Sequence, residues 1–185
     1  MRFVVAMLVL VLWGCESKPP SHPFNNLLQR PGVVTLTDLH PDEIDNRLYA
    51  VNYQRMGLVP VCSQVTLLEL TTKRLRFRVE ATGQTYEYLY HKAASEPFQD
   101  HLARYFGYEC PPALQSLNAL DKRGVALGKA LDGMSKPGVV FAMGYPPPHV
   151  NPSLSSNRWI YWTGRFAKVA VVFDDTGHVL AVDQR

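Results

Sequence analysis

The sequence predicts an α+β protein of two units, an antiparallel β-meander covered by a helix and then a unit with the order α-α-β-β-β. The first is indicated by strict alternation of charged and apolar residues over 74–80, which places Leu75, Phe77 and Val79 on one face of a strand. The second is indicated by helical spacing after residue 117, followed by three apolar runs of strand length. We therefore expect an N-terminal unit at 27–116 and a second unit at 117–185.

The meander is expected to contain strands over 59–70, 74–80 and 84–91, with a tight turn at Thr82-Gly83. Tyr86, Tyr88 and Tyr90 then share one face of the third strand. A helix that Ser95 caps and Gly107 ends should cover this sheet.

A further helix is expected over 41–56, ahead of the meander. Ile44, Leu48 and Val51 follow one another at helical spacing, Pro41 suits the first turn, and Gly57 is a stop signal.

The second unit begins with a helix expected over 121–131 and a shorter one over 136–143, which Ser135 caps and Gly144 ends. The segment 145–157 holds four prolines and is expected to be a loop. Strands should follow over 159–163, 166–173 and 179–183, with the last hairpin turn at 174–177.

The N-terminus indicates export. Residues 1–14 hold one basic residue, Arg2, and an unbroken apolar run of eleven residues from position 3 to 13. A membrane-spanning helix needs about 20 apolar residues, so this run suits the core of a signal peptide. Leu12-Trp13-Gly14-Cys15 resembles the lipobox of bacterial lipoproteins, which implies lipid attachment at Cys15 and, with Glu16 next, the periplasmic face of the outer membrane. An ordinary secretory signal is the alternative. A flexible tether over 15–26 is expected, because residues 16–26 are polar, contain three prolines and show no apolar periodicity.

The composition is that of a globular protein, with 46% hydrophobic and 19% charged residues. The formal net charge of +3 is too small to indicate nucleic-acid binding. Besides Cys15 the chain has Cys62 and Cys110. In an oxidising compartment these two are expected to form a disulfide, with two buried free thiols as the alternative.

Residues 131–183 resemble the BamE (SmpA/OmlA) family, the small lipoprotein of the β-barrel assembly machinery. That family combines a Gly-Met-Ser/Thr turn, a helix ending in Leu-Gly-x-Pro, a Trp-x-Tyr strand and a final strand pair. The matching residues occur here in the same order: Gly133, Met134, Ser135, Gly144, Pro146, Trp159, Tyr161, Phe173, Gly177 and Val179. Each suits a structural role, such as a turn, a helix cap or a buried aromatic, so the signature specifies a fold.

The resemblance implies a non-catalytic scaffold or docking module in envelope and outer-membrane protein assembly. Its partners would be outer-membrane lipid, through acylated Cys15, and an envelope complex such as the β-barrel assembly machinery. Trp162 and Arg165 are the expected partner-binding residues, because an exposed aromatic beside an arginine is typical of an interface anchor. Two departures from the family stand out, a whole unit ahead of the signature and a proline-rich loop at 146–152.

No catalytic residues, cofactor or metal are expected. The six histidines show neither His-x-His nor His-x-x-x-His spacing, and the chain has no Cys-x-x-Cys. Two other functions stay open. One is an inhibitor-type or ligand-binding module, since secreted β-lactamase inhibitor proteins contain a similar α-α-β-β-β unit. The other is a periplasmic enzyme that pairs a cysteine with His91 or His101, or that uses a His/Asp site.

One basic strand has two interpretations. Lys73, Arg74, Arg76 and Arg78 could meet anionic lipid headgroups, or they could form a solvated face that pairs with Glu80 and Glu87.

Overall fold

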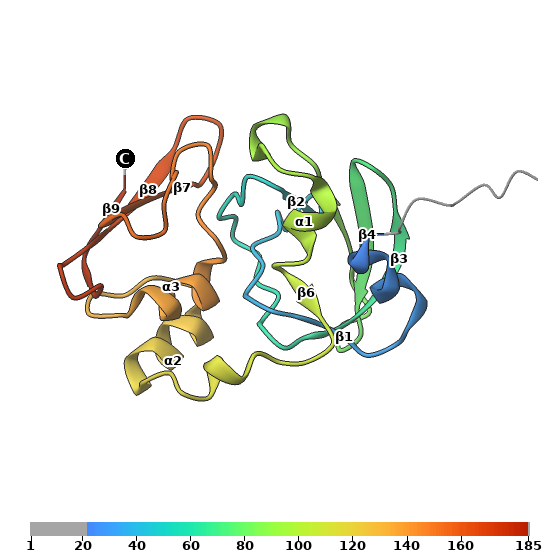
Figure 1. Cartoon of the computed structure of the whole chain (residues 1–185), viewed down its shortest axis with the longest axis horizontal. Helices are drawn as coiled ribbons and strands as arrows, with labels where there is room; N and C mark the ends of the chain where they lie inside the picture. The colour runs from blue at the N-terminus through green and yellow to red at the C-terminus, as the bar shows by residue number, and fades with distance from the viewer. Residues whose placement is uncertain (1–21, 185) are drawn as a thin grey trace, which may run out of the picture.

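A computed structural model describes residues 22–184, so the expected signal peptide and Cys15 lie outside the described residues. The fold is α+β, with a curled six-stranded sheet, a three-stranded sheet and few helices. Figure 1 shows the N-terminal part, from blue to green, beside the C-terminal part, from orange to red. Within residues 22–184, no helix has the length and apolar character that a membrane crossing requires.

The six-stranded sheet contains the predicted meander. Strands β3 (Gln64–Leu70), β4 (Arg74–Val79) and β5 (Thr85–Leu89) are antiparallel, and Leu75, Phe77 and Val79 are buried as expected. Three short strands complete the order β2-β5-β4-β3-β1-β6: β1 (Val33–Thr35), β2 (Arg47–Tyr49) and β6 (Phe106–Gly107).

The prediction of a helix over 41–56 is wrong, because this segment forms a turn and then the edge strand β2. The Asp42 carboxylate accepts hydrogen bonds from the backbone N–H groups of Ile44 and Asp45, and Asn46 has a φ of +54°. Strand β2 then pairs in parallel with β5, which buries Leu48. Local turn chemistry and sheet pairing thus override the helical spacing.

The helix expected from Ser95 to Gly107 is much shorter. Helix α1 spans Phe98–Leu102 and follows Pro97, while Ser95 ends the 3-10 helix η2 (Lys92–Ala94) with a φ of +58°. Phe106 instead joins strand β6 and packs edge-on against Phe77, with 5.2 Å between ring centroids. Pairing with β1 places that aromatic side chain in the core.

The expected tether is structured at its C-terminal end. The 3-10 helix η1 spans Pro23–Gln29, and it buries Phe24 in the N-terminal core beside Phe106. The expectation of an unstructured segment up to residue 26 is therefore wrong from Pro23 onward.

The Cys62–Cys110 disulfide is confirmed. Cys62 lies in the turn before β3, and Cys110 lies just before the 3-10 helix η3 (Pro112–Leu114) in the connection to the second unit. The bridge therefore fastens the start of that connection to the N-terminal sheet.

The second unit has the predicted order α-α-β-β-β. Helix α2 (Ala119–Leu127) ends earlier than expected at Gly128, whereas α3 (Lys136–Met143) has the expected bounds. Strands β7 (Arg158–Trp162), β8 (Lys168–Phe173) and β9 (Val179–Gln184) form an antiparallel sheet in chain order.

The two helices of this unit lie very close together. Asp121 of α2 is buried and accepts hydrogen bonds from the backbone N–H and the hydroxyl of Ser135, both at 2.8 Å. A Cβ on Gly138 would overlap the Asp121 side chain, so only glycine permits this approach. Trp159 and Tyr161 face the helices and are fully buried in a core that includes Met134 and Val139.

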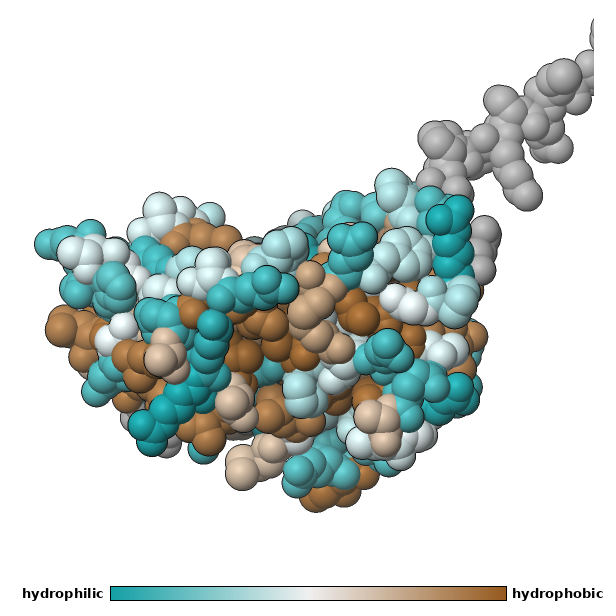
Figure 2. Space-filling model, turned by 90° about the horizontal axis from the view of Figure 1, so that it is seen from below, coloured by the Kyte–Doolittle hydropathy of each residue, from teal (hydrophilic) through white to brown (hydrophobic). Residues whose placement is uncertain are grey.

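The N-terminal unit satisfies the carbonyl groups at the end of α3. The Asp38 N–H donates to the Phe141 carbonyl at 2.8 Å, the His40 Nε2–H donates to the Ala142 carbonyl at 2.8 Å, and the Asn52 amide donates to the Met143 carbonyl at 2.7 Å. A helix leaves its last carbonyls without intrahelical partners, so these bonds join the two units through the C-terminus of α3. Figure 2 shows that apolar side chains reach the surface across the middle of the molecule, where the units meet.

Candidate docking groove

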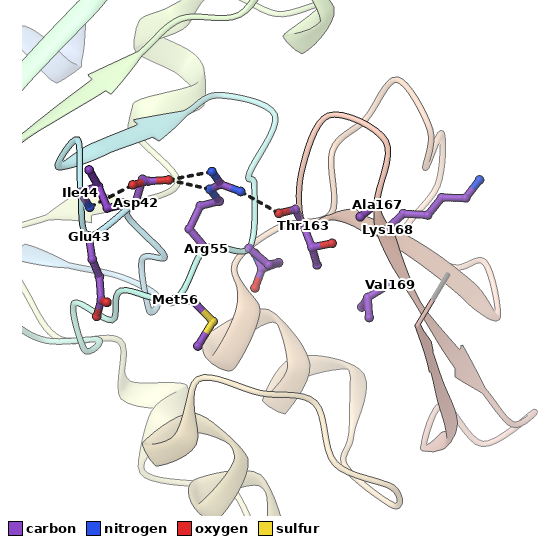
Figure 3. A pocket seen from close by; sticks show the side chains of 10 residues that line it. Asp42, Glu43, Ile44, Arg55, Met56, Thr163, Ala167, Lys168 and Val169 are labelled. Atoms are coloured by element: carbon purple, nitrogen blue, oxygen red, sulfur yellow. Dashed lines mark hydrogen bonds and ion pairs between the residues drawn. The ribbon is translucent and has the colours of Figure 1, made fainter.

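A groove of about 700 Å³ opens between the two units. One wall is the turn segment ahead of β2 together with residues 54–56, and the other is the β7–β8 turn with the first residues of β8. Figure 3 shows Ile44, Glu43 and Met56 on one side and Thr163, Ala167 and Val169 on the other, with Arg55 between them. We call this surface the docking groove.

Arg55 connects the two walls of the docking groove. Its guanidinium forms an ion pair with Asp42 at 2.7 Å and donates to the Thr163 carbonyl at 3.0 Å (Figure 3). The pKa of Asp42 is held below its ordinary value, first by the N–H groups of Ile44 and Asp45 and then by Arg55. The backbone of residue 54 adds a second connection, because its N–H donates to the Trp162 carbonyl at 2.7 Å.

Two of the three most exposed large apolar side chains of residues 22–184 line this groove, and the third belongs to the β7–β8 turn that forms one of its walls. Ile44 is 90% exposed, Met56 is 88% exposed and Phe166 is 84% exposed. Ile44 and Met56 line the groove, and Phe166 lies in the β7–β8 turn between the lining residues Thr163 and Ala167. We call these three residues the apolar rim. Clustered apolar side chains in contact with water are typical of interaction surfaces.

Trp162 and Arg165, the expected partner-binding residues, lie together in a small pocket beside the groove. Trp162 is half-buried, and its ring is nearly parallel to that of His149, with 6.5 Å between centroids. Arg165 is exposed, and its guanidinium carbon lies 5.2 Å from the centre of the Phe166 ring. The structure thus brings the two predicted residues to the edge of the apolar rim.

Several residues of this region were not predicted from the sequence. Ile44 and Met56 were assigned to a helix, although Asp42, Asp45 and Asn46 in close succession are a turn signal that could have exposed the error. His91 and His149 come from distant segments, and no sequence pattern links them to Trp162.

The basic strand is a solvated face with paired charges, which agrees with the second of its two interpretations. Arg74 pairs with Glu69 at 2.9 Å and Glu87 at 3.4 Å, and Arg78 pairs with Glu80 at 3.3 Å. Arg76 also lies 3.7 Å from Glu69. Because three carboxylates face these three arginines, most of the charge of the strand is paired, and Lys73 is its one basic residue without an ion pair among residues 22–184.

The thiol nucleophile considered above is excluded, because both sulfurs are in the disulfide. His101 is buried, and both of its ring nitrogens have hydrogen-bond partners: Nε2 lies 2.9 Å from the Tyr88 hydroxyl and Nδ1 lies 3.0 Å from Glu96. Burial lowers the pKa of this histidine. Within residues 22–184, no group of three or more His, Cys, Asp and Glu side chains is placed to hold a metal ion.

Comparison with protein-family models, with curated proteins and with solved structures finds no match for this chain.

Proposed function

We propose that this chain is a non-catalytic lipoprotein of the outer membrane, anchored on the periplasmic side through acylated Cys15, that acts as a docking module for an envelope protein complex. The lipobox-like sequence ahead of Cys15 supports the anchor. The observation that carries the docking role is the apolar rim, of which Ile44 and Met56 line a groove between the two units and Phe166 lies in the turn that forms one wall.

The resemblance to the BamE family supports assembly of outer-membrane β-barrel proteins as the setting. The second unit, which carries the residues of this resemblance, has the order α-α-β-β-β that the sequence pattern predicts. Met134, Trp159 and Tyr161 lie in its core, and Gly133 and Gly144 have φ values of +85° and +70°. Pro146 is also buried, directly after the end of α3. All six of these residues therefore have structural roles. We assign the docking contacts to the apolar rim and to Trp162 and Arg165.

The apolar rim would bind a partner by inserting its side chains into an apolar surface. Burial of a large aliphatic or aromatic side chain contributes about 1.5–3 kcal/mol relative to exposure, so three such residues can dominate an interface. Trp162 and Arg165 extend this surface on the side of the β7–β8 turn. The rest of the groove supplies polar groups, including Lys168 and the Arg55–Asp42 pair.

Cys15→Ala is expected to abolish recovery of the protein with outer membranes, because stable anchoring of this kind depends on acyl chains. Fractionation with mass spectrometry of the wild-type N-terminus measures this. The lipoprotein assignment would be overturned by a wild-type protein without a lipid mass increase, combined with a Cys15→Ala variant that still fractionates with the membrane.

Replacement of Met56 with a photo-crosslinking amino acid is expected to capture one envelope protein in intact cells, and that protein is identified by mass spectrometry. The double variant Ile44→Ser, Phe166→Ser should then reduce affinity for the identified protein by about thirtyfold or more, since loss of one interface anchor commonly costs about 2 kcal/mol. Leu180 is the matched control for both steps: it is 65% exposed but lies on β9, at the other edge of the sheet from β7. Equal capture from both positions, or unchanged affinity of the double variant, would contradict docking through the apolar rim.

A further inference from the structure

The small pocket beside the docking groove is lined almost entirely by hydrogen-bond donors. It has a volume of about 110 Å³ and is lined by Val51, Tyr53, His91, His149, Trp162 and Arg165. Every one of these side chains except Val51 carries an N–H or O–H group. The lining residues come from both units, and we call this feature the donor pocket.

The donors of this pocket lack acceptors within residues 22–184. The Trp162 indole N–H has no partner there, but it is closed off from water and therefore borders the pocket without opening into it. The Nδ1 atom of His91 accepts a hydrogen bond from the Ala93 N–H at 3.2 Å, so the neutral ring carries its proton on Nε2 and can donate from that atom. Among residues 22–184, Arg165 forms no ion pair, and its guanidinium carbon lies 5.2 Å from the centre of the Phe166 ring. The pocket therefore offers several donors to a ligand that has only acceptors.

Among residues 22–184, no carboxylate lines the donor pocket, and the two carboxylates of the adjoining cleft are already paired. That cleft has a volume of about 390 Å³ and shares Tyr53, His91 and Arg165 with the pocket. Of its two carboxylates, Asp42 pairs with Arg55 at 2.7 Å and Asp45 lies 3.8 Å from the Arg47 guanidinium. The positive charge of Arg165 thus remains uncompensated at the boundary between pocket and cleft.

We propose that the donor pocket binds a phosphate group, either as free phosphate or as the phosphate ester of a larger molecule whose remainder lies in the adjoining cleft. The donor groups of the other polar lining residues suit a tetrahedral oxyanion with four oxygen atoms better than a carboxylate with two; these residues are Tyr53, His91, His149 and Arg165. The pocket volume accommodates one such group, and the cleft provides space for an attached organic part. Phosphate binding at this site needs no protein partner, so the experiment below tests it separately from the docking role.

The test is titration of the full-length mature lipoprotein in neutral detergent with inorganic phosphate and, separately, with glycerol 3-phosphate. Calorimetry gives the two affinities. Nitrogen–proton correlation spectra follow the indole N–H signals, and the signal that is missing in Trp162→Phe is assigned to Trp162. The Trp162 signal should shift with saturation. The indole N–H of Trp159 is also buried without a partner but lies in the core of the second unit, so its signal should stay in place as an internal control. Tighter binding of glycerol 3-phosphate would assign the cleft to the organic part of an ester, whereas equal binding would assign the site to free phosphate.

Arg165→Gln should weaken phosphate binding by at least about tenfold, because a charge-assisted hydrogen bond is lost. Arg158→Gln is the matched control, since Arg158 is exposed on strand β7 and does not line the pocket, and it should bind as wild type. Tyr53→Phe removes one hydroxyl with little change in shape and should weaken binding even if Arg165→Gln proves unstable. The proposal is overturned if phosphate leaves the Trp162 signal unmoved, if acetate binds as tightly, or if Arg158→Gln loses as much affinity as the pocket variants.

Discussion

Trp159→Ala is expected to lower the free energy of unfolding by about 3–5 kcal/mol, the cost of truncating a large buried aromatic side chain. Trp159 is 1% exposed and packs edge-on against Phe173, with 4.6 Å between ring centroids. Both residues belong to the core that α3 and the three-stranded sheet share, so the truncation leaves a cavity that rigid elements surround. Urea unfolding measures the effect as a lower midpoint with an unchanged slope.

Trp162→Ala is the control for that prediction, because Trp162 lies on the same strand but keeps part of its ring in water. It should cost clearly less stability than Trp159→Ala. Trp159→Phe should also cost less, since it retains most of the ring contacts and removes an indole N–H that has no partner among residues 22–184. Equal losses for the two alanine variants would show that Trp159 does not occupy the core position described here.

Asp38→Asn is expected to stabilise the protein above pH 7, by up to about 4 kcal/mol. Asp38 is buried where the two units meet; one carboxylate oxygen accepts the Val61 N–H at 2.7 Å, and the other has no partner within residues 22–184. Burial raises the pKa of this carboxyl from 3.8 to about 7, against the smaller opposing effect of the Val61 hydrogen bond. That difference corresponds to about 4 kcal/mol as an upper bound, because each pKa unit is worth about 1.4 kcal/mol.

The pH dependence of this effect has a definite sign. The folded protein holds the Asp38 proton more tightly than the unfolded chain, so the wild type loses stability as pH rises from about 4 to about 7. The advantage of Asp38→Asn should therefore be absent near pH 3, grow through this window and level off above it. Burial also lowers the pKa of His40, which contacts the same end of α3, but this histidine is present in both proteins and its contribution cancels in the difference.

Asp42→Asn provides a control of opposite sign for the Asp38 prediction. Its carboxylate is stabilised by N–H groups and Arg55, so its pKa is lowered and its contribution to stability is lost as pH falls. Asp42→Asn should thus destabilise the protein at neutral pH, with a difference from wild type that shrinks in acid. Chemical denaturation from pH 3 to pH 9 measures both variants. An Asp38→Asn difference that does not change with pH would contradict a buried carboxyl with a raised pKa.

The local parts of the fold could be predicted because their causes are local. The alternation at Leu75, Phe77 and Val79 determines which face of β4 is buried, and Ser135 and Gly144 mark the two ends of α3 at the predicted positions. Where prediction failed, distant contacts decided the outcome. Leu48 lies in a strand because β5 offers a free edge, and Phe106 lies in a strand because β1 and Phe77 meet it.

The candidate sites depend almost entirely on contacts between distant segments. The predicted pair Trp162 and Arg165 does share a pocket, but its other lining residues, such as Tyr53, His91 and His149, come from separate parts of the chain. Ile44 and Met56 lie beside the β7–β8 turn in a structure where Arg55 bonds to Asp42 and to the Thr163 carbonyl. The bond to Thr163 joins segments more than a hundred residues apart in the chain.

The sequence by itself determined the α+β class, the strand faces and the element order of the second unit, because periodicity, caps and turns carry that information. It also predicted the pairing of Cys62 with Cys110, with two free thiols as the alternative, and the structure confirms that disulfide. Only the tertiary structure decided how the units meet. The end of α3 leaves carbonyl groups without partners, and donors from Asp38, His40 and Asn52 satisfy them across more than ninety residues of chain. Such complementarity depends on the placement of whole elements, and the groove and the donor pocket are consequences of that placement.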